Sequence, residues 1–104
     1  MNTERHHFFV RSTAPPTVEF DSQTPAVYVR FKKASVAKTI PLPCETMHLA
    51  IDLDNKGEVI GLEVVGMDEF SMSSIQTILR KASVDAPSMD FARARFVPAK
   101  LVAA

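Results

Sequence analysis

The stretch 51-IDLDNKGEVIGLE-63, from Ile51 to Glu63, decides how this chain folds. On both sides of its centre, DNKG, apolar residues alternate with polar or small ones, which is the period of two typical of a half-buried β-strand. The alternation extends outward to Met47 and Val64. Gly57 lies at the centre, where a tight turn needs the left-handed backbone conformation that glycine adopts without steric cost. The stretch therefore predicts a β-hairpin.

The apolar pattern also predicts the register of this hairpin. We expect Asp54 and Gly57 to close a four-residue loop. The facing pairs are then Ile51 with Ile60, Leu49 with Leu62 and Met47 with Val64 on one face, and Asp52 with Val59, Ala50 with Gly61 and His48 with Glu63 on the other. A three-residue loop would scatter the apolar residues over both faces, because a slip of one residue moves a side chain to the opposite face. The four-residue loop is therefore favoured unless a bulge intervenes.

Counted from Asp52, the same stretch nearly matches the calcium loop of EF-hand proteins. Where that loop supplies an oxygen ligand, this chain has Lys56, which brings a positive charge instead. The flanking residues alternate with period two, whereas an EF-hand loop lies between helices. We therefore interpret the carboxylates as an acidic surface, and we expect no metal site and no cofactor.

Further runs with period two precede the hairpin, at residues 18–20, 27–31 and 36–40. Pro41 and Pro43 cannot donate to a strand ladder, so we expect the third run to end there. The connections between the runs are short and rich in turn residues. Because strands joined by short connections usually pair with each other, the sequence predicts an antiparallel meander.

After Gly66 the apolar period becomes helical. In residues 73–83 the apolar positions that share one helix face are Ile75, Ile78, Leu79 and Ala82, and Ser73 with Gln76 forms a capping-box pattern. A weaker helix is predicted at about 88–96. We therefore predict an α+β fold, in which an antiparallel four- to five-stranded meander sheet is covered on one face by the helix at about 73–83. The expected organisation is a flexible N-terminal arm (1–16), a single domain (17–83) and a helical C-terminal extension (84–104).

The composition disfavours several classes of protein. The chain has 104 residues, a formal net charge of zero and a pI near 6.8, so no global field attracts a polyanion. No apolar run approaches the length of a membrane span, and the N-terminal residues lack a signal-peptide pattern, so we expect a cytoplasmic protein. The single cysteine, Cys44, cannot form an internal disulfide. Residues 35–79 carry two basic and seven acidic side chains, which makes this middle part a possible surface for a basic partner.

Two segments carry a family resemblance: 18-VEFDSQTPAVYVRF-31 and, after a spacer, 49-LAIDLDNKGEVIGLEVVG-66. Together they resemble the YuzE-like family of small bacterial proteins, a domain of unknown function, over about residues 17–66. The pattern differs at Thr24 and Pro25, where an acidic residue is often found, and the chain continues past the usual end of the family. The resemblance implies a small α+β fold with an antiparallel sheet and no established catalytic residues. It also implies a likeness to antitoxin-type partners, because members are small and often encoded beside small toxin-like proteins.

Three classes of function remain open. The first is a non-catalytic protein-interaction module, antitoxin-like by resemblance, that forms a homo-oligomer or binds a small protein partner. The second is a small-molecule binder or enzyme on the polar side of the sheet, with the candidate residues Tyr28, Arg30, His48, Asp52 and Glu63. Cys44 could be a nucleophile, although an inert thiol is the more ordinary interpretation. The third is weak nucleic-acid binding through the basic residues Arg80, Lys81, Arg93, Arg95 and Lys100. Because no Ser/His/Asp set and no glycine-rich phosphate loop can be recognised, we favour the first class.

Overall fold

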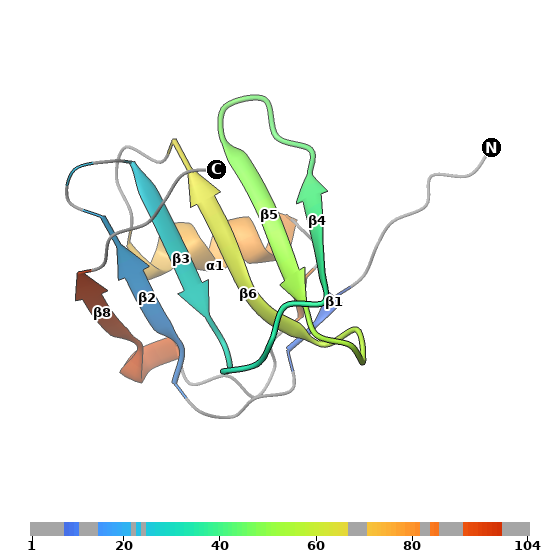
Figure 1. Cartoon of the computed structure of the whole chain (residues 1–104). Coiled ribbons are helices and arrows are strands. Elements are labelled where there is room, and N and C mark those ends of the chain that lie inside the picture. Colours follow the sequence, from blue (N-terminus) through green and yellow to red (C-terminus); the bar gives the residue numbers. More distant parts are fainter. Residues whose placement is uncertain are drawn as a thin grey trace.

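In the computed structural model, a six-stranded sheet has the helix α1 (Met72–Lys81) against one face (Figure 1). The structure describes residues 8–10, 15–21, 23, 25–66, 71–81, 84–85 and 91–98. The strands of this sheet are β2 (Thr17–Phe20), β3 (Ala26–Arg30), β4 (Lys38–Leu42), β5 (His48–Leu53), β6 (Val59–Val65) and β8 (Arg95–Pro98). A separate parallel pair consists of β1 (Phe8–Phe9) and β7 (Val84–Asp85), and a 3-10 turn, η1, spans Phe91–Arg93.

The order of the strands in the sheet is β4-β5-β6-β3-β2-β8, so the predicted meander is wrong. The β2–β3 and β5–β6 hairpins meet at the centre, where β3 pairs with β6, and the connection after β3 crosses to the far edge to form β4. The physical reason lies in the burial of each strand: most residues of β3 and β6 are buried, whereas those of β4 are partly or fully exposed. The two most apolar strands therefore occupy central positions, where they bury most surface.

The predicted C-terminal helix at about 88–96 is also wrong. The chain makes only the short turn η1 and then enters β8, which runs parallel to β2 and converts the sheet from antiparallel to mixed. In the segment that the structure describes, Arg95 and Val97 alternate with Phe96 and Pro98, which also fits a strand. A helix of this length is marginal in water, whereas the ladder to β2 satisfies backbone groups directly. Residues 88–90, the first part of the predicted helix, lie outside the described residues.

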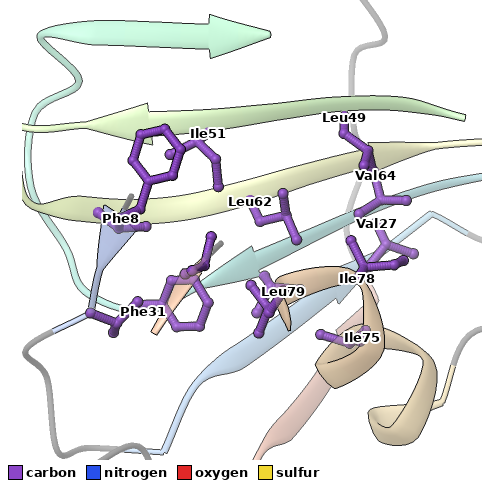
Figure 2. Close-up of a cluster of buried hydrophobic side chains, with 14 of the residues drawn as sticks. Phe8, Val27, Phe31, Leu49, Ile51, Leu62, Val64, Ile75, Ile78 and Leu79 are labelled. Atoms are coloured by element: carbon purple, nitrogen blue, oxygen red, sulfur yellow. The ribbon is translucent and has the colours of Figure 1, made fainter. Parts of the chain in front are cut away.

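The core lies between the sheet and α1. Figure 2 shows side chains from the central strands, among them Val27, Ile51 and Leu62, pointing into the same cluster as Ile75 and Leu79 of α1. Other members of this cluster come from β1 and β7 and include Phe8 and Val84. Fully burying an aliphatic side chain of this size contributes about 1.5–3 kcal/mol. Three residues of the predicted apolar stripe, Ile75, Ile78 and Leu79, therefore do cover one face of the sheet, and Ala82 lies outside the described residues.

The N-terminus of α1 differs in detail from the prediction. The cap is Ser71, whose Oγ accepts a hydrogen bond from the Ser74 backbone N–H at 3.2 Å, while its carbonyl accepts one from Ile75 at 3.0 Å. Ser73 lies inside the first turn instead, and its carbonyl accepts a bond from the Thr77 hydroxyl at 2.9 Å. A serine oxygen two residues earlier thus satisfies one of the unpaired N–H groups that every helix start leaves.

The β5–β6 hairpin forms, but with a different loop and register. Gly57 has φ of +80° and donates to the Asp54 carbonyl at 3.0 Å, and Asp54 N–H donates to the Glu58 carbonyl at 3.0 Å. This is the three-residue loop in which a turn is followed by a left-handed residue. A bulge then makes Ile60 the extra residue, because Leu53 pairs with Val59 while Asp52 pairs with Gly61.

The predicted register of this hairpin is therefore wrong by two residues. The observed pairs are Ile51 with Leu62 and Leu49 with Val64. The shorter loop and the bulge each shift the pairing by one residue. A total shift of two leaves the side chains beyond the bulge on their expected faces, since the side-chain period of a strand is also two. Before the bulge the shift is one residue, so Val59 pairs with Leu53 and lies in the core cluster instead of facing Asp52.

Pro41 lies within β4 and does not end it. The ladder to β5 continues past it to the pair Leu42–Leu49. This is possible because β4 is an edge strand, and a proline whose nitrogen is directed away from the neighbouring strand removes no hydrogen bond from the ladder.

Candidate functional site: the uncovered face of the sheet

The face of the sheet opposite α1 carries the polar residues of the central strands, and no helix lies on it within the described residues (Figure 1). All five candidate residues from the sequence belong to this face, which we call the open face. The cross-strand pairs place Tyr28 beside Glu63, and Gly61 between Arg30 and Asp52. His48 lies in the next row of β5, opposite Val65. The structure therefore brings together residues from positions 28 to 63 of the chain.

At the centre of the open face, Tyr28 and Asp52 form a hydrogen bond across β6. The phenol donates to Asp52 Oδ2 at 2.8 Å, and Thr39 of β4 donates to Asp52 Oδ1 at 2.6 Å. Gly61 makes this contact possible, because a Cβ at that position would overlap with the tip of the tyrosine ring. Burial, followed by the hydrogen bond to the Asp52 carboxylate, raises the pKa of Tyr28 well above its ordinary value of 10.0.

On the other side of the tyrosine, Arg30 pairs with Glu19 of β2. Arg30 Nε donates to Glu19 Oε2 at 2.7 Å and Nη2 donates to Oε1 at 3.3 Å, a bidentate contact. The hydrogen bond to Glu19 raises the pKa of Arg30. The guanidinium also lies 5.0 Å from the centre of the Tyr28 ring, within the range of a cation–π interaction. Together with the two hydrogen bonds to Asp52, these contacts link side chains of the four strands β2, β3, β5 and β4.

His48 and Glu63 are in contact, although not as directly facing residues. His48 Nε2 lies 3.5 Å from Glu63 Oε1, and the two positions are diagonal neighbours because Glu63 faces Ala50. The His48 side chain is 61% exposed and that of Glu63 36% exposed. A pair this exposed contributes little to stability.

Three members of this arrangement were not recognised from the sequence: Glu19, Thr39 and Gly61. Glu19 alternates with Val18 and Phe20, so a β2–β3 register would have placed it beside Tyr28. Thr39 could be found only with the β4–β5 pairing, which the distant connection of β4 obscures. Gly61 is the one small residue in a run of large apolar ones, and this is a signal of close approach by another group.

A second cluster of charges ties the β5–β6 loop to the connection after β3. Lys32 Nζ lies 2.5 Å from Asp54 Oδ2 and 3.3 Å from Glu58 Oε1. Asp54 Oδ1 also accepts backbone N–H bonds from Lys56 and Glu58, each at 2.9 Å. Lys32, with these N–H donors, lowers the pKa of Asp54 to about 2. The cation beside the carboxylates of the EF-hand-like loop is therefore a lysine of the same chain.

The remaining sequence candidates lie elsewhere in the fold. Cys44 is exposed in the β4–β5 connection, with Sγ 3.7 Å from Thr46 Oγ1, and a backbone hydrogen bond from Thr46 lowers the pKa of its thiol. Arg80 and Lys81 are in the last turn of α1, on the opposite side of the sheet. The other basic candidates divide between η1 (Arg93), the open face (Arg95) and the part of the chain outside the described residues (Lys100). They do not form one continuous basic surface in the part of the chain that is described.

The contacts of the open face limit which of its side chains could act as a base or a nucleophile. The Tyr28 phenol donates a hydrogen bond to Asp52 and has a raised pKa, so it stays protonated and is a poor base and a poor nucleophile at neutral pH. The Arg30 guanidinium is held by Glu19. Within the described residues, no group of three or more His, Cys, Asp or Glu side chains is placed to hold a metal ion. These side chains form a fixed pattern of donors and acceptors.

The raised pKa of Tyr28 can be measured directly, because the chain has one tyrosine and no tryptophan. At pH 10.0, where a free phenol is half ionised, we expect the folded protein to show little tyrosinate absorbance in the near ultraviolet. The neutral phenol is favoured in the folded state, so its contribution to stability is complete below pH 10.0 and is lost as the pH rises above that value. Circular dichroism should show unfolding together with ionisation. Half-ionisation near pH 10.0 in a protein that is still folded would contradict the burial and the hydrogen bond.

Comparison with known proteins adds a family but no activity. No curated protein and no solved structure matches the chain. The described residues contain no helix that could span a membrane. Residues 17–67, which are 51 of the 104 residues, match the model of a family described as "Protein of unknown function (DUF2283)". The matched stretch covers β2 to β6, the strands that supply all five candidate residues of the open face. It is this part of the chain that is similar to a domain family of unknown function, DUF2283.

Proposed function

We propose that the protein is a non-catalytic protein-interaction module whose open face binds a small protein partner in the cytoplasm. The observation that carries the proposal is the network on that face. Glu19, Arg30, Tyr28, Asp52 and Thr39 come from four strands and are joined by hydrogen bonds of 2.6–3.3 Å and, between Arg30 and Tyr28, by the cation–π contact. Side chains fixed before binding lose little conformational entropy when a partner arrives, and this is an advantage for recognition.

The charge of the open face favours a partner with basic groups. Asp52 accepts hydrogen bonds only from uncharged hydroxyls, and Glu63 contacts only the exposed His48, so neither carboxylate pairs with Lys or Arg in the described residues. Both lie in the acidic middle of the chain. An arginine or lysine of a partner would find acceptors here, and complementary charge of this kind increases association rate and specificity. The YuzE-like and antitoxin-like resemblance supports the same class of partner, a small protein.

The test is co-purification followed by a measured affinity. A small protein should co-purify with the tagged chain from its native host, and calorimetry with the two recombinant proteins should give a dissociation constant. Glu63→Lys should weaken this binding at least about tenfold, because it reverses a charge at the contact. Glu45→Lys is the matched control, since Glu45 is exposed in the β4–β5 connection, and it should change the affinity by less than about twofold. Binding that is unaffected by Glu63→Lys, or a chain that never acquires a second protein, would contradict the proposal.

A further inference from the structure

A single row of residues crosses the open face with opposite charges at its ends. The cross-strand pairs run from Asp52 to Gly61, then Arg30, then Thr17, and finally Arg95 on β8. Asp52 and Arg95 are therefore on the same face and in the same row, four strand spacings or about 19 Å apart. The midpoint of the row is Arg30 on β3.

Neither end of the row has an ionic partner within the described residues. Asp52 accepts from Tyr28 and Thr39, both uncharged, and Arg95 is exposed and belongs to none of the ion pairs found there. The separation of about 19 Å is too large for the two to neutralise each other in water, where charges more than a Debye length of about 8–10 Å apart are screened. Each end could therefore pair with a charge supplied from outside.

We propose that the open face is also the interface of a two-fold dimer, with a second copy of this chain as its occupant. This inference rests on the proposed function, since it names a partner for the same surface. Consider a two-fold axis that runs parallel to the strands and passes over β3 on the open face. This axis places β5 of one copy over β8 of the other. Asp52 of each copy then faces Arg95 of the other, which makes two symmetric ion pairs, as an isologous interface requires.

The neighbouring row is compatible with the same axis. It runs from Ala50 to Glu63, Tyr28, Glu19 and Val97. Ala50 then faces Val97 of the other copy, an apolar contact. Glu63 faces the other copy's Glu19, whose charge is already neutralised by Arg30. Arg30 uses two of its five N–H groups on Glu19, so three remain to donate to the approaching Glu63 carboxylate.

Two further features bear on the strength of this dimer. The formal net charge of the chain is zero, so two copies do not repel each other as they approach. The facing strands cover roughly 500 Å² per copy, from a strand spacing of about 4.8 Å and a rise of about 3.3 Å per residue. This is below the roughly 800 Å² per partner of a standard interface. We therefore expect a weak, exchangeable dimer with a dissociation constant on the order of micromolar, which a tighter partner could displace.

Sedimentation equilibrium over a range of protein concentrations tests the dimer with the full chain. The wild type should change from monomer to dimer in the micromolar range, and added salt should weaken the association because exposed ion pairs are screened. Arg95→Asp should weaken the dimer at least about tenfold, since it sets two like charges against each other at each contact. Arg80→Asp makes the same change on the exposed surface of α1 and should leave the dimer unchanged.

A charge swap distinguishes this interface from any other. Asp52→Lys alone and Arg95→Asp alone should both be monomeric, while an equimolar mixture of the two should form a heterodimer, because each contact then again joins opposite charges. Circular dichroism checks that Asp52→Lys is folded. If it is not, Asp52→Asn, which keeps an oxygen to accept from Tyr28 and Thr39, replaces it. This variant should also weaken the dimer, and its mixture with Arg95→Asp should regain one of the two ion pairs and associate more tightly than either variant alone.

The possible outcomes separate this inference from the proposed function. A wild type that remains monomeric at all concentrations, or a dimer that is indifferent to Arg95→Asp, overturns the dimer. If Glu63→Lys still weakens the binding of a small protein partner in that case, the proposed function stands. If the charge swap restores association and no other protein binds, the dimer stands and the small protein partner is wrong.

Discussion

Leu62→Ala is expected to lower the free energy of unfolding by about 3–4 kcal/mol, which is a large share of the stability of a domain of this size. Leu62 lies on β6, near the middle of the sheet, and is 0% exposed. Its side chain points into the space between the sheet and α1, in the same cluster as Ile51 and Leu79 (Figure 2). Truncating the Leu62 side chain removes the favourable free energy of burying its carbons. It also leaves a cavity, because the surrounding side chains on several elements cannot all move in to fill the space.

Leu42→Ala is the matched control for this prediction. Leu42 is on the edge strand β4 and only partly buried, although it packs against the same cluster. The same chemical change should cost less than about half as much there, because the site can collapse toward solvent. Urea unfolding followed by circular dichroism gives both values. Equal losses at positions 42 and 62 would mean that the core is not centred between β6 and α1.

Gly61→Ala is expected to destabilise the protein by about 2 kcal/mol, although alanine in a strand is normally more stable than glycine by about 0.5–1 kcal/mol. The backbone at Gly61 is not in the left-handed region, so the expected loss has a different origin. A Cβ there would overlap with the end of the Tyr28 ring, which must move away and give up its hydrogen bond to Asp52. A hydrogen bond to a charged group is worth about 1.5–3 kcal/mol, less where solvent reaches it.

A double-mutant cycle isolates this cause. In a Tyr28→Ala background no ring lies over position 61, so Gly61→Ala should become neutral or stabilising by up to about 1 kcal/mol. The reversal of sign is the diagnostic result, and chemical denaturation of the four proteins measures it. If Gly61→Ala destabilises both backgrounds equally, the clash is with the backbone or the core, and Tyr28 does not depend on Gly61 for its place.

The β5–β6 hairpin was predictable because its signals are local. Alternation in residues 47–53 and 59–65 and a glycine at 57 suffice to locate two strands and a turn. The exact register was not predictable, because the apolar pattern is unchanged by a shift of two residues. The bulge at Ile60 depends on contacts outside the hairpin, including the Phe31 and Lys32 N–H groups that both donate to the Ile60 carbonyl.

The strand order was not predictable, because it depends on long-range competition. Adjacent runs usually pair, but β3 buries more surface against β6 than it would against the exposed β4. Likewise the start of β8 was assigned to a helix because Ser88 could cap one and Arg93 and Arg95 lie late in it, and only the open side of β2 makes a strand the better choice. Both errors come from partners that are distant in the sequence.

The candidate residues of the open face could be listed from the sequence, but their connections could not. Tyr28, Arg30, Asp52 and Glu63 occupy the polar positions of alternating runs, so they were expected on the polar side of a sheet. Which of them touch depends on the β3–β6 pairing, which brings Tyr28 across Gly61 to Asp52. No rule of spacing within the sequence gives that contact.

Pro41 has a consequence for how copies of this protein can grow into larger assemblies. An open sheet edge is a template on which identical chains can add strand after strand, and this is one route to fibrils. At the β4 edge, Pro41 offers no N–H to an incoming strand, and Pro43 follows just beyond the end of β4. A chain added there would find interruptions in its ladder within a few residues. Polymerisation through this edge is thereby opposed, so at a high concentration in the cell the sheet is protected from indefinite extension on that side.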